Sequence, residues 1–439
     1  MTTVTFVGAG SVVFTKDLLT DLSRWADDVP MTWRLHDIDP RRLEVAVGVA
    51  RALVAERGLT ARVEAHADRR SALEGADAVV VTVMVGGLEA TRADLRLPMA
   101  RGLHQTIGDT LGVGGIFRGL RSAGFYRELV DDVRELCPAA WVLNYTNPMA
   151  INMGLVHALA PDLKVLGLCH SVHWTMETLS DLVGVPLAET SFLAAGVNHQ
   201  SWVLEWRRGT EDLHPRLDAA IAADPELRRR VRVDVYRRLG RFPTESSEHS
   251  AEYLPWYLRH ESEVARLRLE PGEYEGISEE NVAEYEATAS ALEEGRPLEF
   301  ATEAVEYAPQ VIASLATGEE RTIYATVPND GLLDDLPAGA PVEVPVVVGA
   351  GGASPVRVGG LPPVCAALNR RFLDVVDHTV RAALTEDPQL VRHAALLDPN
   401  TAASLTVDEV DAVLTDLTRA HRDHLPAGLA EVRYGTDAH

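Results

Sequence analysis

Short runs of apolar, largely β-branched residues alternate with helix-like segments over the first 170 residues of the chain. Continuous apolar runs are typical of strands that are buried on both faces of a parallel sheet. The expected strands cover residues 4–8, 32–37, 78–84, 141–144 and 165–169, and the expected helices cover residues 11–25, 40–57, 116–136, 148–159 and 171–183. This alternation predicts an α/β fold with a Rossmann-type, doubly wound sheet.

The pattern changes after the last of these helices. Residues 192–197 and 202–206 are expected to form antiparallel strands, and residues 342–348 a further strand that a glycine-rich turn follows. The later expected helices lie within residues 212–241, 279–294, 361–396 and 407–421. We therefore predict a nucleotide-binding domain over residues 1–185 and a C-terminal mixed α+β domain over residues 186–439, which carries substrate, metal and oligomer contacts.

Composition excludes several classes of function. The chain has 65 acidic and 41 basic residues and a net charge of -24, so nucleic acid and membrane surfaces are not expected as partners. It has three cysteines and no run of about 18 apolar residues, and its first residues lack the features of a signal peptide. We expect a cytoplasmic protein that acts on a small molecule.

The first strand leads into a glycine turn. Gly8 permits a tight turn, and Gly10 lets the backbone approach a pyrophosphate at the start of a helix, although Val13 stands where a third glycine is usual. The next strand ends in Asp37, whose carboxylate suits the ribose hydroxyls of NAD and would repel the phosphate of NADP. Asp39 is a competing candidate, and a solvated loop is the alternative for both. The residues expected to contact NAD are Gly8, Gly10, Ser11, Val12, Asp37, Val83 and Asn144.

Two further segments offer polar groups near the expected ligand edge of the sheet. Asn147 could contact nicotinamide and substrate, or it could cap the helix that Pro148 starts. The glycine-rich run over residues 108–115 could direct Asp109 at a ligand, or it could be a flexible lid. It lacks the Lys-Ser/Thr pair of a phosphate-binding loop, which argues against nucleotide hydrolysis.

Cys169 ends a predicted strand, and His199 follows about thirty residues later. A thiolate and an imidazole can bind a divalent metal ion with open positions, although thiolates favour zinc or iron over manganese. A buried cysteine and a satisfied histidine are the alternative. Residues 244–253 concentrate acids, histidine and tyrosine. Tyr253 could act as a base beside a cation or pack in the core, while His249 and Glu252 could face a ligand or solvent.

Taken together and in this order, the motifs resemble those of glycoside hydrolase family 4. They are Gly8-Ala9-Gly10-Ser11, Gly108-Asp109-Thr110, Asn144-Tyr145-Thr146-Asn147-Pro148-Met149, Cys169-His170-Ser171-Val172, Gly196-Val197-Asn198-His199, and the segments 247–256, 327–331 and 397–405. The resemblance implies a lactate/malate-dehydrogenase-like fold, bound NAD, a divalent metal ion that is typically Mn2+, and a homodimer or homotetramer.

The resemblance also implies hydrolysis by redox-assisted elimination, which departs from the usual pair of carboxylates. NAD+ takes a hydride from C3 of the sugar, Tyr253 removes the proton from C2, and the metal on Cys169 and His199 stabilises the enediolate. The aglycone leaves, water adds to C1, and the hydride returns. The residues expected to bind substrate are Asn147, Asn198 and His249.

His170 bears on the substrate, because family members that act on phosphorylated sugars commonly have Asp or Asn at that position. The run Cys169-His170-Ser171-Val172 resembles the α-galactosidase subgroup, so unphosphorylated α-galactosides are the expected substrates. The general acid could be His170, Asp109 or a metal-bound water. α-Glucosides or α-glucuronides are alternative substrates. Outside this chemistry, the chain could be a hydroxy-acid or sugar dehydrogenase, or a non-catalytic sensor of NAD or sugar.

Overall fold

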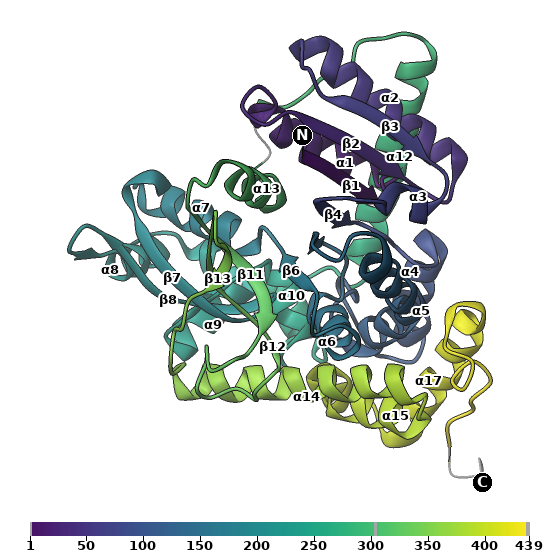
Figure 1. The fold of residues 1–439 in the computed structure, drawn as a ribbon. Coiled ribbons are helices and arrows are strands. Elements are labelled where there is room, and N and C mark those ends of the chain that lie inside the picture. Colours follow the sequence, from purple (N-terminus) through teal and green to yellow (C-terminus); the bar gives the residue numbers. More distant parts are fainter. Residues whose placement is uncertain (1, 303–304, 436–439) are drawn as a thin grey trace.

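The computed structural model describes residues 2–302 and 305–435, and within them thirteen strands form one sheet (Figure 1). Six of these strands are parallel and lie in the order β3 (Arg62–His66), β2 (Met31–His36), β1 (Thr2–Val7), β4 (Ala78–Val81), β5 (Trp141–Asn144) and β6 (Lys164–Leu168). This is the doubly wound order, in which the strand order reverses between β1 and β4, the point at which such sheets generally bind a ligand. The predicted fold class is confirmed.

The sheet continues beyond β6 with strands from the second half of the chain. In order, they are β11 (Arg321–Pro328), β12 (Pro341–Gly349), β7 (Ser191–Val197), β8 (Gln200–Arg208) and β10 (Phe242–Pro243). In addition, β13 (Gly352–Pro355) pairs with β12, and β9 (Glu211–Asp212) pairs with β8. β11 pairs antiparallel with β6, and β7 and β8 form the predicted antiparallel pair. The division at residue 185 stays a prediction, because hydrogen bonds join both parts into one sheet.

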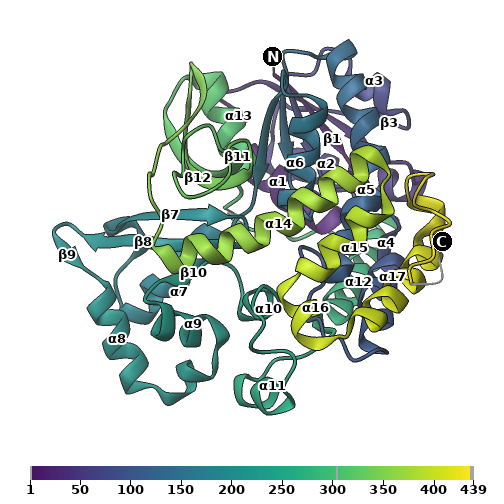
Figure 2. The same cartoon turned by 90° about the horizontal axis from the view of Figure 1, so that it is seen from below.

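Helices cover both faces of this sheet (Figures 1 and 2). Those of the first part are α1 (Val12–Leu22), η1 (Ser23–Trp25), α2 (Pro40–Arg57), α3 (Arg69–Leu73), α4 (Gly87–Met99), α5 (Gly112–Leu136), α6 (Met149–Leu159) and α7 (Ser171–Val183). Those that follow are η2 (Leu187–Glu189), α8 (His214–Ala223), η3 (Pro225–Arg229), α9 (Val231–Leu239), α10 (Ser247–Glu252), α11 (Glu261–Leu267), α12 (Glu273–Glu293), α13 (Tyr307–Thr317), α14 (Pro363–Thr385), α15 (Pro388–Leu397), α16 (Pro399–Ser404), α17 (Val407–His421) and η4 (Arg422–His424).

Local sequence explains where the predicted helices begin and end. Asp39 caps α2 by accepting from the N–H groups of Arg41 and Arg42, and Gly58 ends the helix with a positive φ of 63°. A capping box between Thr406 and Glu409 starts α17. These two helices have the bounds expected from the sequence.

The structure corrects the expected start of the helix over residues 116–136, which the glycine-rich run precedes. Gly112 begins α5, so the last glycines of the run form the first helical turn instead of a loop. A Cβ at Gly115 would lie 2.5 Å from the carbonyl carbon of Thr110, and one at Gly114 would lie 2.6 Å from the carbonyl oxygen of Gly108. The glycines therefore permit close packing of α5 against the strand-like loop that carries Asp109.

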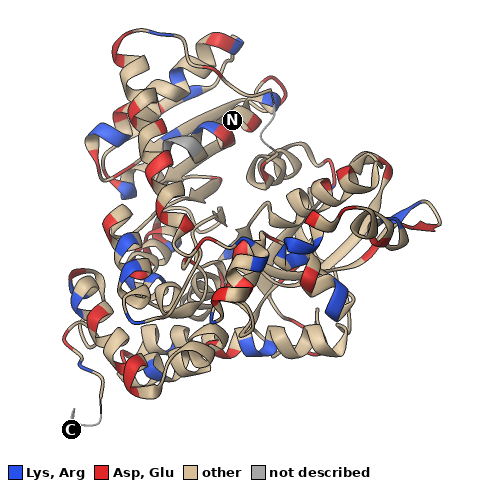
Figure 3. Ribbon diagram, turned by 180° about the vertical axis from the view of Figure 1, so that it is seen from behind, with Lys and Arg blue, Asp and Glu red and all other residues tan. Residues whose placement is uncertain are grey.

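The second half of the chain also packs on the first through α12. Arg92 of α4 pairs with Glu275 at 3.2 Å, and Arg41 of α2 pairs with Glu286 at 2.8 Å. Such pairs between charged residues recur over the surface, where basic and acidic side chains are interspersed (Figure 3). None of the helices in the described ranges is long and apolar enough to cross a membrane.

Two glycines of α5 give a matched test of this packing. We expect Gly114→Ala to lower the free energy of unfolding by about 1–3 kcal/mol, since its Cβ would meet backbone atoms that cannot move aside. Gly124→Ala in the same helix meets nothing within 4 Å and should be neutral or stabilise by about 0.5–1 kcal/mol. Denaturant unfolding measures both, and equal effects would contradict the packing argument.

Candidate active site

The glycine turn after β1 is tied to the end of β2. Gly8 has a φ of 89°, and the backbone N–H of Gly10 donates to Oδ2 of Asp37 at 2.8 Å. A Cβ at Gly10 would lie 2.5 Å from that oxygen, so only glycine fits there. The other Asp37 oxygen accepts from the N–H of Asp39 at 2.9 Å. Asp37 therefore lies against the turn, whereas Asp39 caps α2.

The other predicted cofactor residues differ in how they lie around the glycine turn after β1. Ser11 is exposed immediately before α1, and Val12 begins the helix, although its side chain lies outside the described set. Val83 packs on the turn, with its Cγ1 2.9 Å from the place of a Cβ on Gly8. These residues surround the N-terminus of α1, where backbone N–H groups favour an anion.

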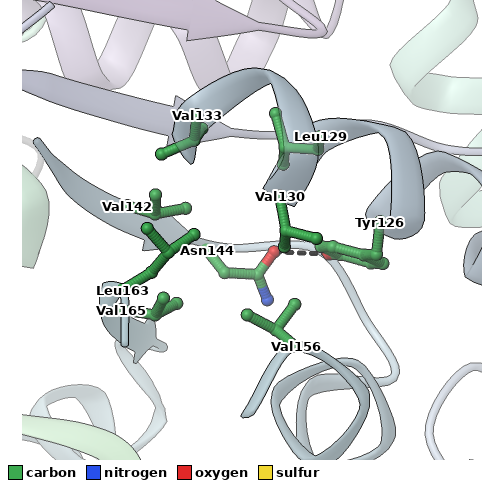
Figure 4. A pocket seen from close by; sticks show the side chains of 9 residues that line it. All are labelled: Tyr126, Leu129, Val130, Val133, Val142, Asn144, Val156, Leu163 and Val165. Carbon is green, nitrogen blue, oxygen red and sulfur yellow. Dashed lines mark hydrogen bonds between the residues drawn. The ribbon is translucent and has the colours of Figure 1, made fainter. Parts of the chain in front are cut away.

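The side chain of Asn144 is buried in the protein interior. Its Oδ1 accepts from the hydroxyl of Tyr126 at 2.6 Å (Figure 4). Its Nδ2 donates to the carbonyl of Thr146 at 3.1 Å. The side chain borders a cavity of about 10 Å³ with otherwise apolar walls, too small for a ligand. Its amide is thus engaged inside the protein, and the backbone of Asn144 is what remains for a cofactor contact.

His199 lies at the centre of the second cluster. It has a φ of 68° in the turn between β7 and β8 and is 4% exposed. Its Nε2 lies 3.4 Å from Sγ of Cys169 and 3.6 Å from Oε2 of Glu245. Its Nδ1 lies 3.0 Å from Oγ1 of Thr110 and 3.4 Å from the hydroxyl of Tyr253. One imidazole therefore joins the end of β6, the loop before α5 and the segment 244–253.

The partners of Thr110 determine which nitrogen of His199 carries a proton. The Thr110 hydroxyl donates its single hydrogen to Oδ1 of Asp109 at 2.8 Å, so it can only accept from His199. Nδ1 of His199 is then the protonated nitrogen, and Nε2 directs its lone pair toward Cys169. Metal-binding histidines commonly have this arrangement, in which the other ring nitrogen donates a hydrogen bond.

Asp109 is held in place from several directions. It accepts from Nδ2 of Asn147 at 2.9 Å, and its Oδ1 lies 3.4 Å from Nε2 of His249. Glu252 secures the preceding loop by accepting from the backbone N–H groups of Thr106, Ile107 and Gly108. Glu252 is therefore buried in a positioning role rather than solvated.

Burial and charge act against each other on these groups. Burial opposes ionisation of Asp109, but the hydrogen bond and charge of His249 outweigh it and hold the pKa of Asp109 below its usual range. The pKa of Glu245 is likewise lowered, since His199 and His249 outweigh its burial. The pKa of His249 is raised because Glu245 and Asp109 more than offset its desolvation. The cluster thus favours ionisation of its two carboxylates and protonation of the His249 imidazole.

Cys169 and Tyr253 are shifted toward their neutral forms. Burial raises the pKa of the Cys169 thiol to about 11, and it raises the pKa of the Tyr253 phenol well above 10, with Asp109 and Glu252 adding to the shift. Both would ionise more readily beside a cation, which stabilises a thiolate or a phenolate.

His170 lies at the edge of the cluster. Its ring stacks on Trp174 with a centroid separation of 3.4 Å, and its Nδ1 lies 3.4 Å from Oε1 of Glu306. Burial opposes protonation of His170, but Glu306 outweighs it and raises the pKa of His170 above its ordinary value. The buried Glu306 carboxylate therefore favours the protonated form of the ring.

Asn198 is engaged with a residue that the sequence did not single out. Its Nδ2 donates to Oε1 of Glu343 at 2.8 Å, and Glu343 is buried on β12. Thr110, Glu245, Glu306 and Glu343 were all missed as site residues. Two of them carried a usable signal, since Thr110 stands in the motif Gly108-Asp109-Thr110 and Glu245 lies one turn before His249 in the run of acids and histidine.

The donor atoms fit a divalent metal ion. Ligand atoms of Cys169, His199 and Glu245 lie within 4.8 Å of one another, and Asp109, His199 and His249 form a second such group. Sulfur, imidazole nitrogen and carboxylate oxygen are the usual metal ligands in proteins. The glycine turn, in turn, fits the pyrophosphate of a dinucleotide.

The two candidate ribose ligands can be separated by substitution. We expect Asp37→Ala to weaken NAD binding by at least about tenfold, because a charge-assisted hydrogen bond contributes about 1.5–3 kcal/mol. Asp39→Ala should instead lower stability by about 0.5–2 kcal/mol through loss of the α2 cap, with nearly unchanged NAD affinity. Calorimetric titration of NAD into both variants, freed of bound cofactor, decides between them, and the reverse result would assign the ribose to Asp39.

Family models and related proteins match most of the chain. The model of the family 4 glycosyl hydrolases matches residues 3–185, and that of the family 4 C-terminal domain matches residues 194–401. An α-galactosidase of Bacillus subtilis is 33% identical, with 97% of this chain and 99% of that protein covered. An α-galactosidase of Rhizobium meliloti is 34% identical, with 96% and 89% covered.

A solved 6-phospho-α-glucosidase from gut microorganisms, in complex with NAD and Mn2+, has the same fold. It superimposes with a TM-score of 0.83 over 97% of this chain and 99% of that one, at 21% identity. Two family models match in chain order, and the two relatives align over nearly the whole length. The chain therefore belongs to family 4 of the glycosyl hydrolases and is an NAD- and divalent-metal-dependent glycoside hydrolase.

Proposed function

We propose that this enzyme hydrolyses unphosphorylated α-galactosides. The observation that carries the proposal is the convergence of Cys169 and Tyr253 on the imidazole of His199, with His170 next to Cys169 in the chain. Full-length similarity to two α-galactosidases supports the sugar. His170 supports the lack of a phosphate group, since the phospho-sugar enzymes that the sequence resembles commonly carry Asp or Asn there.

In this proposal Cys169 and His199 hold the metal ion, and Gly8, Gly10 and Asp37 hold NAD. When bound, NAD removes and returns a hydride at C3 of the sugar, and the metal ion polarises the neighbouring oxygens. Asn147, Asn198 and His249 contact the sugar hydroxyls. Among their polar atoms, Oδ1 of Asn198 is buried without a hydrogen-bond partner in the described residues, which suits it to accept from a hydroxyl.

Tyr253 removes the proton from C2 in this proposal. The tyrosine is 2% exposed, and its hydroxyl lies 3.4 Å from Nδ1 of His199. Its raised pKa makes the phenolate a strong base once a nearby positive charge allows it to form. The base therefore depends on the charges that gather around His199.

His170 donates the proton to the departing oxygen in this proposal, in preference to Asp109. Glu306 favours the protonated imidazole, whereas Asp109 is held ionised by His249 and has no proton to give. The stacked Trp174 limits the orientations that the His170 ring can adopt.

We also propose a cytoplasmic homodimer or homotetramer. The resemblance to family 4 supports the oligomer, and the free cysteines Cys137, Cys169 and Cys365 suit a reducing compartment. Size measurement by light scattering tests the oligomer, and a monomer would contradict it.

The substrate is tested with p-nitrophenyl α-galactoside, α-glucoside and α-glucuronide, while Mn2+, NAD+ and reductant are omitted one at a time. We expect release of nitrophenol from the galactoside that disappears without NAD+ or metal. Preference for another glycoside would reassign the sugar. Net accumulation of NADH during turnover would favour the dehydrogenase alternative, and tight NAD binding without turnover would favour a sensor.

The base is tested by isotope exchange. In D2O, Tyr253→Phe should slow incorporation of deuterium at C2 by about 10²–10⁴-fold, the usual contribution of a positioned general base. Tyr257→Phe is the matched control, because Tyr257 donates to Asp234 at 3.1 Å and does not contact the cluster. Exchange at the normal rate in Tyr253→Phe would remove the assignment.

A further inference from the structure

We infer that Glu245 is a third protein ligand of the metal ion, beside Cys169 and His199. The inference rests on the proposed roles of those two residues and adds a hard oxygen to their sulfur and nitrogen. The three ligand atoms are drawn from the end of β6, the β7–β8 turn and the loop before α10. They lie within 4.8 Å of one another.

The distances between the three ligand atoms match those expected around one shared cation. Nε2 of His199 lies 3.4 Å from the Cys169 sulfur and 3.6 Å from Oε2 of Glu245. Atoms that share one ion at about 2.0–2.3 Å lie at such separations from each other. A direct nitrogen–oxygen hydrogen bond would bring the latter pair to about 2.7–3.2 Å.

The Glu245 carboxylate accepts no hydrogen bond across the described ranges. It forms two long ion pairs, one with His199 and one with His249, each at 3.6 Å. A largely buried carboxylate without hydrogen bonds is costly unless it is closely paired or binds a metal ion. Arg232 lies close enough to interact electrostatically with Glu245 but forms no ion pair with it in the described structure.

The backbone supports a functional placement of Glu245. It has a φ of 72°, in the left-handed region that non-glycine residues seldom occupy, and His199 is in the same region with a φ of 68°. Such strain costs about 1–3 kcal/mol and persists where the surrounding structure enforces it. The N–H of Glu245 donates to Oγ1 of Thr175 at 3.2 Å, which holds the strained residue in place.

Asp109 is the competing third ligand and is less suited. Its oxygens already accept from Thr110 and Asn147, and Thr110 places Asp109 on the Nδ1 side of His199. Cys169 and Glu245 lie together on the Nε2 side, where the lone pair is free. A carboxylate there also favours Mn2+, which a thiolate and an imidazole alone would not select.

The test is a titration of metal-free protein with Mn2+ alone. Calorimetry measures the heat of binding, and electron paramagnetic resonance measures the concentration of free Mn2+. We expect Glu245→Gln to weaken Mn2+ binding at least about tenfold, which is about 1.4 kcal/mol. Competition between Mn2+ and Zn2+ should shift toward Zn2+. Glu248→Gln is the matched control, since Glu248 lies three residues away and outside the ligand group, and it should bind Mn2+ within about twofold of wild type.

A second variant guards against misfolding. Glu245→Gly removes the carboxylate and relieves the positive φ, so the metal-free protein should be as stable as wild type or more stable, yet bind Mn2+ weakly. Wild-type Mn2+ affinity in either Glu245 variant would overturn the inference.

Cys169→Ser separates this inference from the proposed site as a whole. Weak binding in Cys169→Ser together with normal binding in the Glu245 variants would overturn the role of Glu245 alone. Normal binding in Cys169→Ser would overturn the ligand pair as well. The readout uses no glycoside, so it is independent of which sugar the enzyme hydrolyses.

Discussion

The active site depends on one imidazole that makes different contacts with its two nitrogens. Nδ1 of His199 faces the Thr110 hydroxyl and, through it, Asp109, while Nε2 faces Cys169 and Glu245. Loss of the Thr110 contact would free the ring to exchange tautomers and turn its lone pair away from the thiol. The orientation of the Nε2 edge, which holds the metal ion in the proposed site, is therefore set by Thr110 on the opposite side of the ring.

The continuous sheet makes this arrangement possible. Cys169 follows β6 of the parallel part, and His199 follows β7 of the antiparallel part, with β11 and β12 between them in the sheet. Glu343 on β12 accepts from Asn198, which secures the turn that presents His199. The antiparallel strands thus place His199 beside Cys169, at the edge of the sheet where the parallel strands end.

Local pattern predicted five of the six parallel strands, because each is a continuous apolar run, and it singled out Cys169, His199 and Tyr253, which the structure brings together. It missed β3, whose residues are mostly half-buried or exposed at the sheet edge, and β11, one of whose partners, β6, lies more than 150 residues away. Glu306 and Glu343 were missed for the same reason, since their roles come from contacts with distant residues. Asn144 ends a strand, as the sequence pattern expects of a cofactor residue, yet its amide makes hydrogen bonds with Tyr126 and Thr146 inside the protein.

The electrostatics of the cluster couple metal binding to proton release. Without a cation, burial keeps Cys169 and Tyr253 protonated, so the folded protein avoids two further buried negative charges next to Asp109 and Glu245. In the proposed function, a divalent ion on Cys169 would reverse this balance, because it would offset the charge of a thiolate directly and lower the cost of a phenolate nearby. The same burial that keeps Cys169 and Tyr253 neutral without the ion would therefore let Tyr253 act as a base only when the ion is bound. The buried surroundings of His199 thus influence both the basicity of Tyr253 and the binding of the ion in the proposed site.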